Sequence, residues 1–465
     1  MPPGAREGPS NLERMPAAHL PVRVVVLNFN GGEHTLRSLR HLAATEWPAE
    51  ELELICVDNA SSDGSVEALA AALPAVEIRQ VGRNAGFPAN NHALRDLDGV
   101  RYVALVNNDA FVEPGWLAPL VEALDADLGL GAVCPKLILA PRFTEVVVEA
   151  PRFDPGPSDP RPLGVMVRGA QVAGTEVWRD THVGEGGYGR EADAAGTFEW
   201  LAPRGVVRLP VPDASRDGDG EVSATLLLQA ARAVTVTVDG GAGPETVTVG
   251  TAPTPVTVAL TGERFDVLNN VGSQVYVDGA GADRGWLVRD DGRYDEPVEV
   301  FAWCGGAVLM RPEYLSDVGL FDERFFLYYE DTDLSWRGRA RGWRYRTVPT
   351  SRVRHLHAAS SGEGSEVFAY HVERNRLLML VKNAPARQAL DQILRYKLVT
   401  LSYARRDIVR PLLGRHRPRT TIVRRRVGSF VGFLRLLPAM LGDRRILRRR
   451  QQVPDTELTA WLVRR

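Results

Sequence analysis

The stretch Val22-Arg-Val-Val-Val-Leu-Asn-Phe-Asn30 opens a series of alternating strand and helix patterns that continues to about residue 140. Its apolar part, Val22 to Leu27, is typical of a buried strand. The elements that follow are a helix over 33–42, a strand over 52–57, a helix over 65–73, a strand over 76–80, a helix near 89–97 and a strand over 102–106. This order predicts an α/β domain with a mostly parallel sheet covered by helices.

Polar side chains follow each predicted strand of this sheet. They are Asn28-Phe-Asn30, Asp58-Asn59, Asn84 and Asn107-Asn-Asp109. Any one of them alone could stabilise a turn or cap a helix. Together they favour a binding crevice, because ligands of open α/β sheets bind at the carboxyl ends of the strands.

A second acidic group lies in the run Gly319-Leu-Phe-Asp-Glu-Arg-Phe-Phe-Leu-Tyr-Tyr-Glu-Asp-Thr-Asp-Leu-Ser-Trp-Arg337. We interpret it as an aromatic strand that delivers Glu330, Asp331 and Asp333 to the start of a helix. Upstream, the apolar run 299–310 contains Gly305-Gly306. Adjacent glycines inside such a run indicate a close approach of the backbone to a neighbour or a ligand.

Between these two regions the pattern changes at Pro141. From there to residue 262, period-two runs such as 224–228, 234–238, 246–249 and 256–260 are separated by Gly, Pro and Asp. They predict an inserted antiparallel β domain resembling a sandwich, with an interaction or spacer role. The α/β domain is therefore expected in two halves, 21–140 and 263–385, with residues 1–20 as a disordered N-terminus.

The C-terminal stretch 386–465 is strongly basic. It holds 20 Lys and Arg against five acids, a net charge of +15 in a chain whose total is −2. We expect an amphipathic helical tail that contacts an anionic membrane, with nucleic acid as a less favoured partner and packing on the core as the alternative. Its apolar segment 427–442 is interrupted by Arg435 and Pro438, so it is expected to lie in an interface rather than to span a membrane.

The two remaining compositional signals concern location. The first 20 residues lack the apolar core of a signal peptide. Cys56, Cys134 and Cys304 lie far apart, without metal-ligand spacing or an even disulfide count. We therefore predict a cytoplasmic protein, peripheral on the inner face of the plasma membrane.

Six motifs, in this order along the chain, resemble those of family 2 glycosyltransferases with the GT-A (Rossmann-like) fold, in particular the bacterial rhamnosyltransferase and galactofuranosyltransferase branch. The resemblance covers about 20–140 and 264–385. The motifs are Val24-Val-Val-Leu-Asn-Phe-Asn-Gly31, Val57-Asp-Asn-Ala-Ser-Ser-Asp-Gly64, Asn84-Ala-Gly-Phe-Pro-Ala-Asn-Asn91, Asn107-Asn-Asp109, Cys304-Gly-Gly306 and Tyr329-Glu-Asp-Thr-Asp-Leu334.

The resemblance implies a nucleotide-sugar donor and a divalent cation, Mg²⁺ or Mn²⁺, at its diphosphate. Asp109 matches the metal-binding acid, and His355 matches a histidine that completes the metal site, with His357 as a less favoured substitute. Asn107 departs from the family pattern, where an acid is common. The residues expected at the nucleotide-sugar are Asn28, Asp58 (toward the base), Asn84, Asn107, Asn108 (toward the ribose), Gly305 and Gly306.

The resemblance places the acceptor, and the residue that takes its proton, at the acidic run that contains Glu330 and Asp331. In a single displacement with inversion, a carboxylate must accept the proton of the attacking hydroxyl. The family match assigns that general base to Asp331. Glu330 would position the acceptor or the donor, and Asp333 is expected to cap the following helix.

These expectations describe an inverting, metal-dependent glycosyltransferase that moves a sugar, with rhamnose as the preferred choice, to a hydroxyl of a cell-surface glycan or its lipid-linked precursor. One alternative is a non-catalytic glycan-binding or scaffold protein with a degenerate core, in view of Asn107. Another is a sugar nucleotidylyltransferase, which shares the fold. Against it, Asn28-Phe-Asn-Gly-Gly32 stands where a Gly-rich phosphate loop with Arg and Lys is expected.

Overall fold

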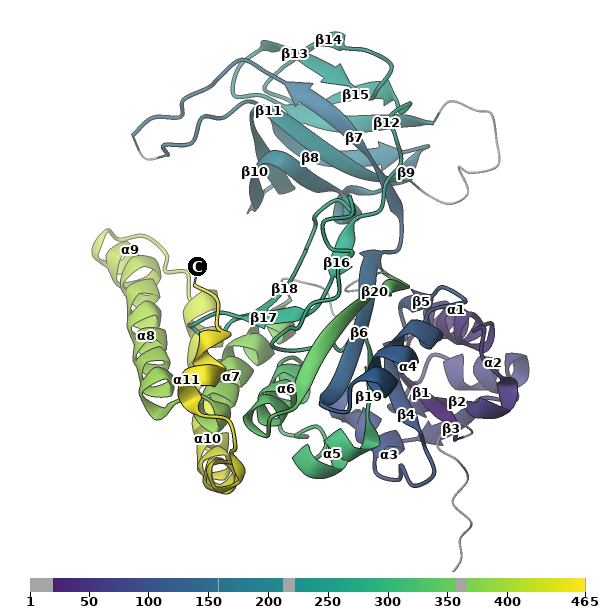
Figure 1. Cartoon of the computed structure of the whole chain (residues 1–465). Helices are drawn as coiled ribbons and strands as arrows, with labels where there is room; N and C mark the ends of the chain where they lie inside the picture. The colour runs from purple at the N-terminus through teal and green to yellow at the C-terminus, as the bar shows by residue number, and fades with distance from the viewer. Residues whose placement is uncertain (1–19, 158, 212–221, 357–364, 465) are drawn as a thin grey trace, which may run out of the picture. The chain divides into compact units, whose positions relative to one another are not determined.

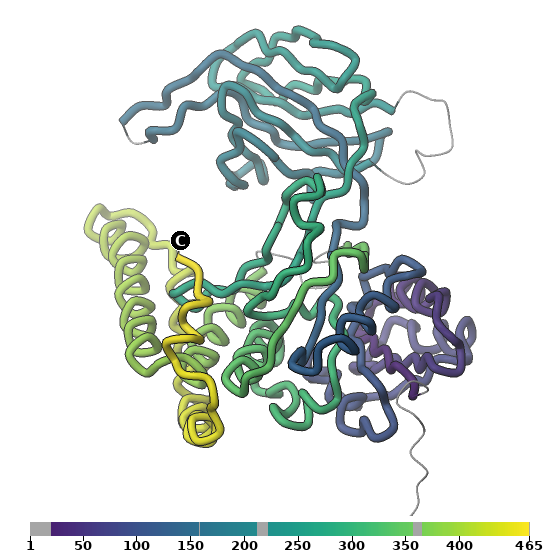
Figure 2. The backbone as a smooth tube through the Cα atoms, viewed as in Figure 1, coloured from purple at the N-terminus to yellow at the C-terminus, as the bar shows by residue number. Residues whose placement is uncertain are grey.

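The computed structural model describes residues 20–157, 159–211, 222–356 and 365–464. The expectations for residues 1–19 and for His357 lie outside the described residues. The chain forms two compact units. The first comprises residues up to 137, 270–284 and 295–465, and the second comprises 138–269 and 285–294. Figure 2 traces the chain from the first unit into the second and back.

A nine-stranded mixed sheet of order β3-β2-β1-β4-β19-β6-β20-β5, with β16 paired to β6, belongs mainly to the first unit (Figure 1). The last residues of β6 and most of β16 fall within the bounds of the second. Strands β1, β2, β3 and β4 are parallel, which confirms the α/β prediction. The strands are β1 (Val22–Asn28), β2 (Leu52–Asp58), β3 (Glu77–Gln80), β4 (Tyr102–Asn107), β5 (Ala110–Val112), β6 (Leu130–Leu139), β16 (Leu268–Asn270), β19 (Ala307–Met310) and β20 (Arg344–His355). A two-stranded sheet of β17 (Ser273–Val275) and β18 (Gly281–Asp283) lies in the first unit.

Alternate residues of β1 explain the layering of this sheet. Val22, Val24 and Val26 belong to one apolar cluster, with α1, α2 and α4. Val25 belongs to a second cluster, with α3, α5 and α6. A strand buried on both faces is mostly apolar, and the exceptions in β1 lie near its two ends, Arg23 in an ion pair with Glu53 and Asn28 in hydrogen bonds. The helices are α1 (Gly32–Ala43), η2 (Ala49–Glu51), α2 (Ser65–Ala72), η3 (Phe87–Asn90), α3 (Asn91–Leu94), α4 (Leu117–Ala126), α5 (Pro312–Val318) and α6 (Glu330–Ala340).

The second unit is a separate antiparallel sheet, as predicted. Its order is β14-β13-β7-β11-β8-β12-β15, with β10 on β11 and β9 on β8. The long β11 pairs with β8 through Glu199 and Trp200 and with β7 through 204–211, and strands from both sides share one apolar core. The elements are β7 (Arg142–Glu149), β8 (Met166–Val172), β9 (Thr175–Glu176), η4 (Trp178–Asp180), β10 (His182–Asp193), β11 (Gly196–Val211), β12 (Ser223–Gln229), β13 (Val234–Asp239), β14 (Glu245–Val249) and β15 (Thr254–Ala259).

A group of helices completes the first unit after β20. Phe433 and Met440 of α10 are buried in an apolar cluster with Leu377 to Val381 of α7. Among the described residues, no helix is both long and apolar enough to cross a membrane. The helices are α7 (Glu366–Asn383), α8 (Ala386–Ala404), the π-helical turn η6 (Arg405–Val409), α9 (Arg410–Leu413), α10 (Thr421–Arg450) and α11 (Asp455–Ala460).

The prediction of an aromatic strand before α6 is wrong. The stretch 319–329 is described throughout and forms turns and bends instead. Phe326, Tyr328 and Tyr329 have φ values of 65°, 68° and 72°. These left-handed conformations are incompatible with an extended strand.

Candidate active site

The carboxyl ends of β1 and β2 are joined by one buried side chain. Asn28 Nδ2 donates to Asp58 Oδ1 at 3.0 Å, and also to the hydroxyl oxygens of Ser61 at 3.0 Å and Ser65 at 2.8 Å. Both Asn28 and Asp58 are less than 5% exposed. Asp58 Oδ2 accepts the backbone N–H of Ser61 at 3.2 Å. The two polar residues predicted from separate strand ends therefore form one hydrogen-bonded unit.

A threonine links this unit to the end of β4. Asn108 Nδ2 donates to Thr35 Oγ1 at 3.1 Å, and Thr35 Oγ1 donates to Asn28 Oδ1 at 2.7 Å. Gly31 lies beside this contact, where a Cβ atom would stand 2.1 Å from Thr35 Oγ1 and 2.3 Å from Asn108 Nδ2. Sequence reasoning missed Thr35. Its signal was a hydroxyl group among the core-facing positions of α1, next to Leu36.

The end of β3 is joined through Asn59 rather than Asp58. Asn59 Nδ2 donates to Asn84 Oδ1 at 2.9 Å and to the carbonyl oxygen of Gly86 at 3.2 Å. Asn84 Oδ1 in turn accepts the N–H of Gly86 at 2.9 Å. Asn84 therefore fixes its own loop, and the loop is tied to β2.

At the end of β4, Asp109 meets the end of β20. Asp109 Oδ1 lies 3.0 Å from His355 Nε2, and both residues are buried. Asn107 Nδ2 lies 3.5 Å from the same ring nitrogen. A carboxylate and an imidazole fit a divalent cation that completes its coordination with phosphate oxygens and water. Within the described ranges, no cluster of three or more His, Cys, Asp or Glu is arranged for a metal.

Gly305-Gly306 connects the β4 end to the acidic helix. The carbonyl oxygen of Gly306 accepts the N–H of Asn107 at 3.0 Å, while the N–H of Gly305 donates to Asp331 Oδ2 at 3.2 Å. A Cβ on Gly306 would lie 3.0 Å from Leu137 Cδ1 and 3.7 Å from the His355 ring. Two adjacent residues thus touch both regions that the sequence separates by some 220 positions.

Asp331 and Glu330 occupy different environments at the start of α6. Asp331 Oδ1 accepts the N–H and the hydroxyl of Thr332, at 2.5 and 3.1 Å. Burial raises the pKa of Asp331, and these donors oppose the shift. Glu330 is 5% exposed, and its Oε2 has no hydrogen-bond partner in the described part of the chain. Burial and the adjacent Asp331 carboxylate raise the pKa of Glu330 well above its usual range.

The Glu330→Gln variant is expected to be more stable than the native protein above pH 4–5. A carboxyl group whose pKa is higher in the folded chain stabilises the fold at acid pH, and that contribution is lost as the pH rises. The difference in the free energy of unfolding between Glu330→Gln and the native protein should grow above about pH 4.3, by up to about 1.4 kcal/mol per pH unit. Urea unfolding across pH 4–8 measures it.

The matched control is Glu323→Gln. Glu323 is an exposed acid whose carboxylate lies 3.0 Å from Arg95. Its removal should change stability by less than about 0.5 kcal/mol, with no gap that widens with pH. Parallel pH profiles for native protein and Glu330→Gln would show that Glu330 is ionised in the folded chain.

The turn before α6 is held by a residue that the sequence did not reveal. Asn375 Nδ2 on α7 lies 2.8 Å from the carbonyl oxygens of Phe325, Leu327 and Tyr328. Left-handed residues cost about 1–3 kcal/mol each and persist only where their surroundings fix them. Asn375 therefore fixes the backbone that aims Glu330 and Asp331. In the sequence it is one polar residue in a helical run, with no spacing that marks it.

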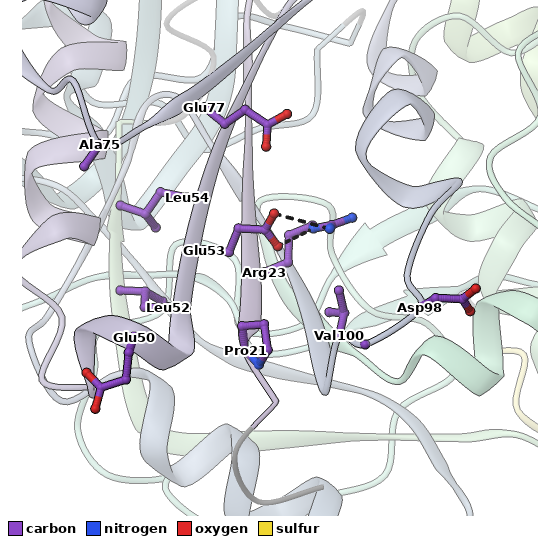
Figure 3. A pocket seen from close by; sticks show the side chains of 11 residues that line it. Pro21, Arg23, Glu50, Leu52, Glu53, Leu54, Ala75, Glu77, Asp98 and Val100 are labelled. Atoms are coloured by element: carbon purple, nitrogen blue, oxygen red, sulfur yellow. Dashed lines mark hydrogen bonds and ion pairs between the residues drawn. The ribbon is translucent and has the colours of Figure 1, made fainter. Parts of the chain in front are cut away.

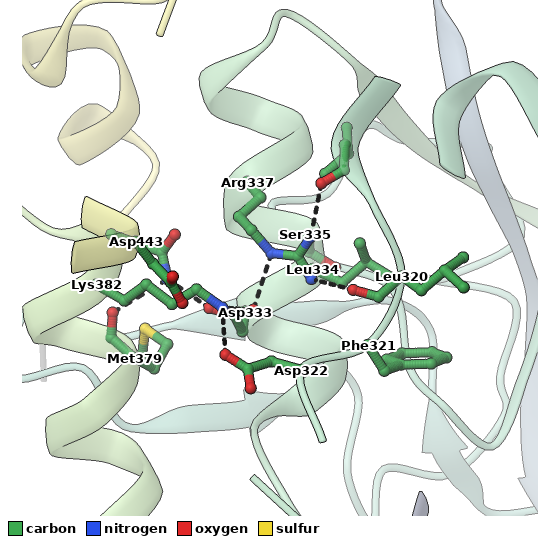
Figure 4. A network of polar contacts seen from close by, with 12 residues as sticks. Leu320, Phe321, Asp322, Asp333, Leu334, Ser335, Arg337, Met379, Lys382 and Asp443 are labelled. Atoms are coloured by element: carbon green, nitrogen blue, oxygen red, sulfur yellow. Dashed lines mark hydrogen bonds and ion pairs between the residues drawn. The ribbon is translucent and has the colours of Figure 1, made fainter. Parts of the chain in front are cut away.

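The prediction that Asp333 caps α6 is wrong. The helix begins at Glu330, and Asp333 is fully buried within its first turn. Its carboxylate binds Arg337 Nε at 2.9 Å, Lys382 Nζ at 2.9 Å and Asn383 Nδ2 at 2.8 Å (Figure 4). Lys382 also donates to Asp322 at 2.7 Å. The acid thus joins α6 to α7, and its partners lie too far along the chain for a local pattern to show them.

Two hollows lie at opposite ends of the parallel strands. One, of about 550 Å³, adjoins the carboxyl ends of β2 and β3 and is lined by Asp58, Ser61, Gly64 and Gln80 among others. The other, of about 530 Å³, lies at the amino ends, around the Arg23–Glu53 ion pair (Figure 3). Because open α/β sheets bind ligands at carboxyl ends, the first is the candidate donor pocket.

Residues 23–141 match the model of glycosyl transferase family 2. The N-acetylglucosaminyl-diphospho-decaprenol L-rhamnosyltransferases of two Mycobacterium tuberculosis strains, CDC 1551 / Oshkosh and ATCC 25618 / H37Rv, are each 40% identical over 72 residues. That match covers 15% of this chain and 24% of each relative, so the chain spans about a quarter of the length of the curated relatives it matches.

Solved structures with a similar chain path are more distant. GalNAc-T7 with UDP, GalNAc and Mn²⁺ has 12% identity and a TM-score of 0.43, covering 78% of this chain and 48% of its own. S. aureus TarS 1–349 in complex with UDP has 11% identity and a TM-score of 0.38, and the match covers 94% of this chain and 89% of TarS 1–349. The mannosyltransferase PcManGT from Pyrobaculum calidifontis, in complex with GDP-Man and Mn²⁺, has 14% identity and a TM-score of 0.36. That match covers 95% of this chain and 79% of PcManGT.

Proposed function

We propose that this chain, whose residues 23–141 form a family 2 glycosyltransferase domain, transfers a sugar with inversion from a nucleoside diphosphate donor to a hydroxyl group. The observation that carries the proposal is the position of Gly305-Gly306. This pair is bonded to Asn107 on one side and to Asp331 on the other. The group that would bind the departing diphosphate and the carboxylate that would accept the proton can therefore belong to one site.

The donor nucleotide is assigned to the carboxyl ends of β1 to β4. The base would enter the pocket beside Asp58, whose carboxylate accepts a hydrogen bond from it. Asn28 orients that carboxylate through their 3.0 Å contact. Asn84 shapes the neighbouring loop, and Asn108, held by Thr35, would lie toward the ribose.

The diphosphate is assigned to the Asp109–His355 pair. These two side chains would hold Mg²⁺ or Mn²⁺, which when bound neutralises the charge that develops on the departing diphosphate. Asn107 supplies a neutral amide where an acid would add a second anionic side chain. A side chain on Gly305 would meet Phe87 and one on Gly306 would meet Leu137, so the two glycines let the backbone pack closely beside the pair.

Asp331 is assigned as the general base. Three donors from Gly305 and Thr332 orient its carboxylate, and a carboxylate has about four lone-pair sites, so one remains for the acceptor hydroxyl. Asp331 takes the hydroxyl proton as the oxygen attacks the anomeric carbon. Glu330, neutral because of its raised pKa, would donate a hydrogen bond to the acceptor or the donor.

We assign rhamnose, carried by dTDP, as the first donor to test, and a cell-surface glycan or its lipid-linked precursor as the acceptor. The 72-residue match to the mycobacterial rhamnosyltransferases supports this choice. A lipid-linked acceptor would place the protein at the inner face of the plasma membrane. The basic stretch 386–465 supports such a location.

Incubation with a panel of nucleotide sugars and Mg²⁺ or Mn²⁺ tests the activity. Metal-dependent release of a nucleoside diphosphate from one donor, without acceptor at first, is the expected result. Glycan binding without any release would favour the scaffold alternative instead. Formation of a nucleoside triphosphate from pyrophosphate and the sugar nucleotide would favour a nucleotidylyltransferase.

A further inference from the structure

Exposed apolar side chains are concentrated on one helical arm of the first unit. Among the described residues, eight of the 17 exposed large apolar side chains lie between Leu390 and Leu413. This arm, formed by α8, η6 and α9, runs beside α7 and α10 (Figure 1). The next largest group is on α10, where Val427, Val431, Leu434, Leu441 and Ile446 are exposed, and the remaining four are scattered.

The exposed leucines of α8 form one stripe. Leu390, Leu394, Leu398 and Leu401 follow the four- and three-residue spacing of a single helix face. The opposite face carries the buried Ala389, Gln392 and Tyr396. Tyr396 donates to Glu373 of α7 at 2.8 Å and stacks on Phe430 of α10. The arm is thus fixed to the unit by one face and presents the leucine stripe on the other.

The end of the arm combines the largest apolar exposure with a cluster of cations. Leu413 is 81% exposed and Leu412 57%. The segment 405–419 contains six arginines and one acid, Asp407. That acid already binds Arg406 at 2.6 Å. The tip therefore pairs exposed leucines with a net positive charge of five.

The apolar segment 427–442, which the sequence analysis expected to lie in a membrane interface, packs in part against the protein itself. In α10, Ser429, Gly432, Phe433 and Met440 are buried. The flanking arginines also bind within the protein. Arg426 Nη1 reaches Glu373 at 3.0 Å, and Arg444 donates to the carbonyl oxygens of Val381 and Ala384 at 2.8 and 2.6 Å. Much of the charge around 427–442 therefore anchors helices to one another.

We propose that the arm tip, defined as Leu412, Leu413 and the arginines of 405–419, docks on an anionic lipid surface, with the α8 leucine stripe adjoining it. Leucines enter the headgroup boundary while arginines meet phosphate groups, the combination that holds interfacial helices. A nucleic acid would neutralise the arginines but leave the leucines in water. A second copy of the chain in a twofold contact would bring equal positive charges together.

Flotation of the full chain with vesicles tests the docking. The chain is expected to bind phosphatidylcholine vesicles containing phosphatidylglycerol, and to bind phosphatidylcholine alone much more weakly. The triple variant Arg415→Gln, Arg417→Gln, Arg419→Gln should lower the partition coefficient about 100-fold, at about fivefold per cation. The pair Leu412→Asp, Leu413→Asp should lower it about tenfold or more.

Matched controls replace the same kinds of exposed side chain, leucine and arginine, outside the arm. Leu128→Asp changes a leucine that is 76% exposed outside the arm. Arg40→Gln, Arg95→Gln, Arg204→Gln removes three exposed arginines and the same net charge. Both should bind vesicles like the native chain. Equal losses in controls and tip variants would overturn the proposal, because binding would then follow overall charge or hydrophobicity.

The two alternative binding partners of the arm, a second copy of the chain and a nucleic acid, would give different results. A dimer in sedimentation equilibrium that dissociates in Leu412→Asp, Leu413→Asp, with no vesicle binding, would make the arm a self-association surface. Binding to a DNA duplex in preference to anionic vesicles would equally overturn lipid docking. Vesicle binding needs no donor, so a chain that docks but releases no nucleoside diphosphate would contradict the proposed activity and leave the docking surface intact.

Discussion

Replacing Asp331 by asparagine is expected to lower sugar transfer by about 100- to 10,000-fold, the usual contribution of a general base. Asparagine keeps an oxygen that can accept the N–H of Gly305 or Thr332, so the start of α6 should keep its geometry. The amide cannot take a proton from the acceptor. Initial rates of transfer, with saturating donor, measure the effect.

Two measurements separate this loss from a structural one. The donor dissociation constant and the melting temperature of Asp331→Asn should stay close to those of the native chain. The control Asp125→Asn removes a carboxylate that binds Arg101 and Tyr102, both at 2.7 Å, outside the site, and it should leave transfer unchanged. Near-native transfer by a folded Asp331→Asn protein would assign the base to another group.

The pH profile of the native chain gives an independent check on Asp331. A general base acts only when it is deprotonated, so transfer should fall as the pH drops through its pKa. Because burial raises the pKa of Asp331, this acid limb should lie above about 3.9, the value for an ordinary aspartate. Because the raised pKa of Glu330 keeps it neutral over that range, Glu330→Gln should leave the limb where it is.

The parts of the fold that local patterns encode could be predicted from the sequence. The valines of β1 are apolar on both faces because helices cover both sides of the sheet, a pattern typical of a central strand in an α/β domain. The strands β12 to β15 alternate with period two for the complementary reason, one face of the sheet being buried. The polar strand ends that meet around Asn28 followed from the same topology.

What could not be predicted depends on contacts distant in sequence. The aromatic run before α6 has high strand propensity, yet Asn375 holds it in turns from about 50 positions further along. Asp333 has the side chain of a helix cap, yet Lys382 and Asn383 bind it in the interior. In both cases α7 determines the local conformation, and no pattern within the acidic run records that.

Replacing Asp109 by alanine is expected to abolish metal-dependent turnover of the donor. The Asp109 side chain is buried with His355, its partner in the proposed metal site, at 3.0 Å. Removing one of two protein ligands should weaken Mn²⁺ binding by about 10- to 150-fold, since each charged contact contributes about 1.5–3 kcal/mol. Electron paramagnetic resonance of free Mn²⁺, with donor present, measures this affinity without relying on turnover.

His355→Ala tests the second half of the pair. If Asp109 and His355 share one cation, the losses of Mn²⁺ affinity in the two single variants should not add in the double variant, because the first removal already breaks the shared site. The control Asp125→Ala removes a carboxylate that binds Arg101 and Tyr102, outside the site. Unchanged Mn²⁺ affinity in Asp109→Ala would show that the cation lies elsewhere, and the neutral Asn107 would then fit a site that works without a metal held by the chain.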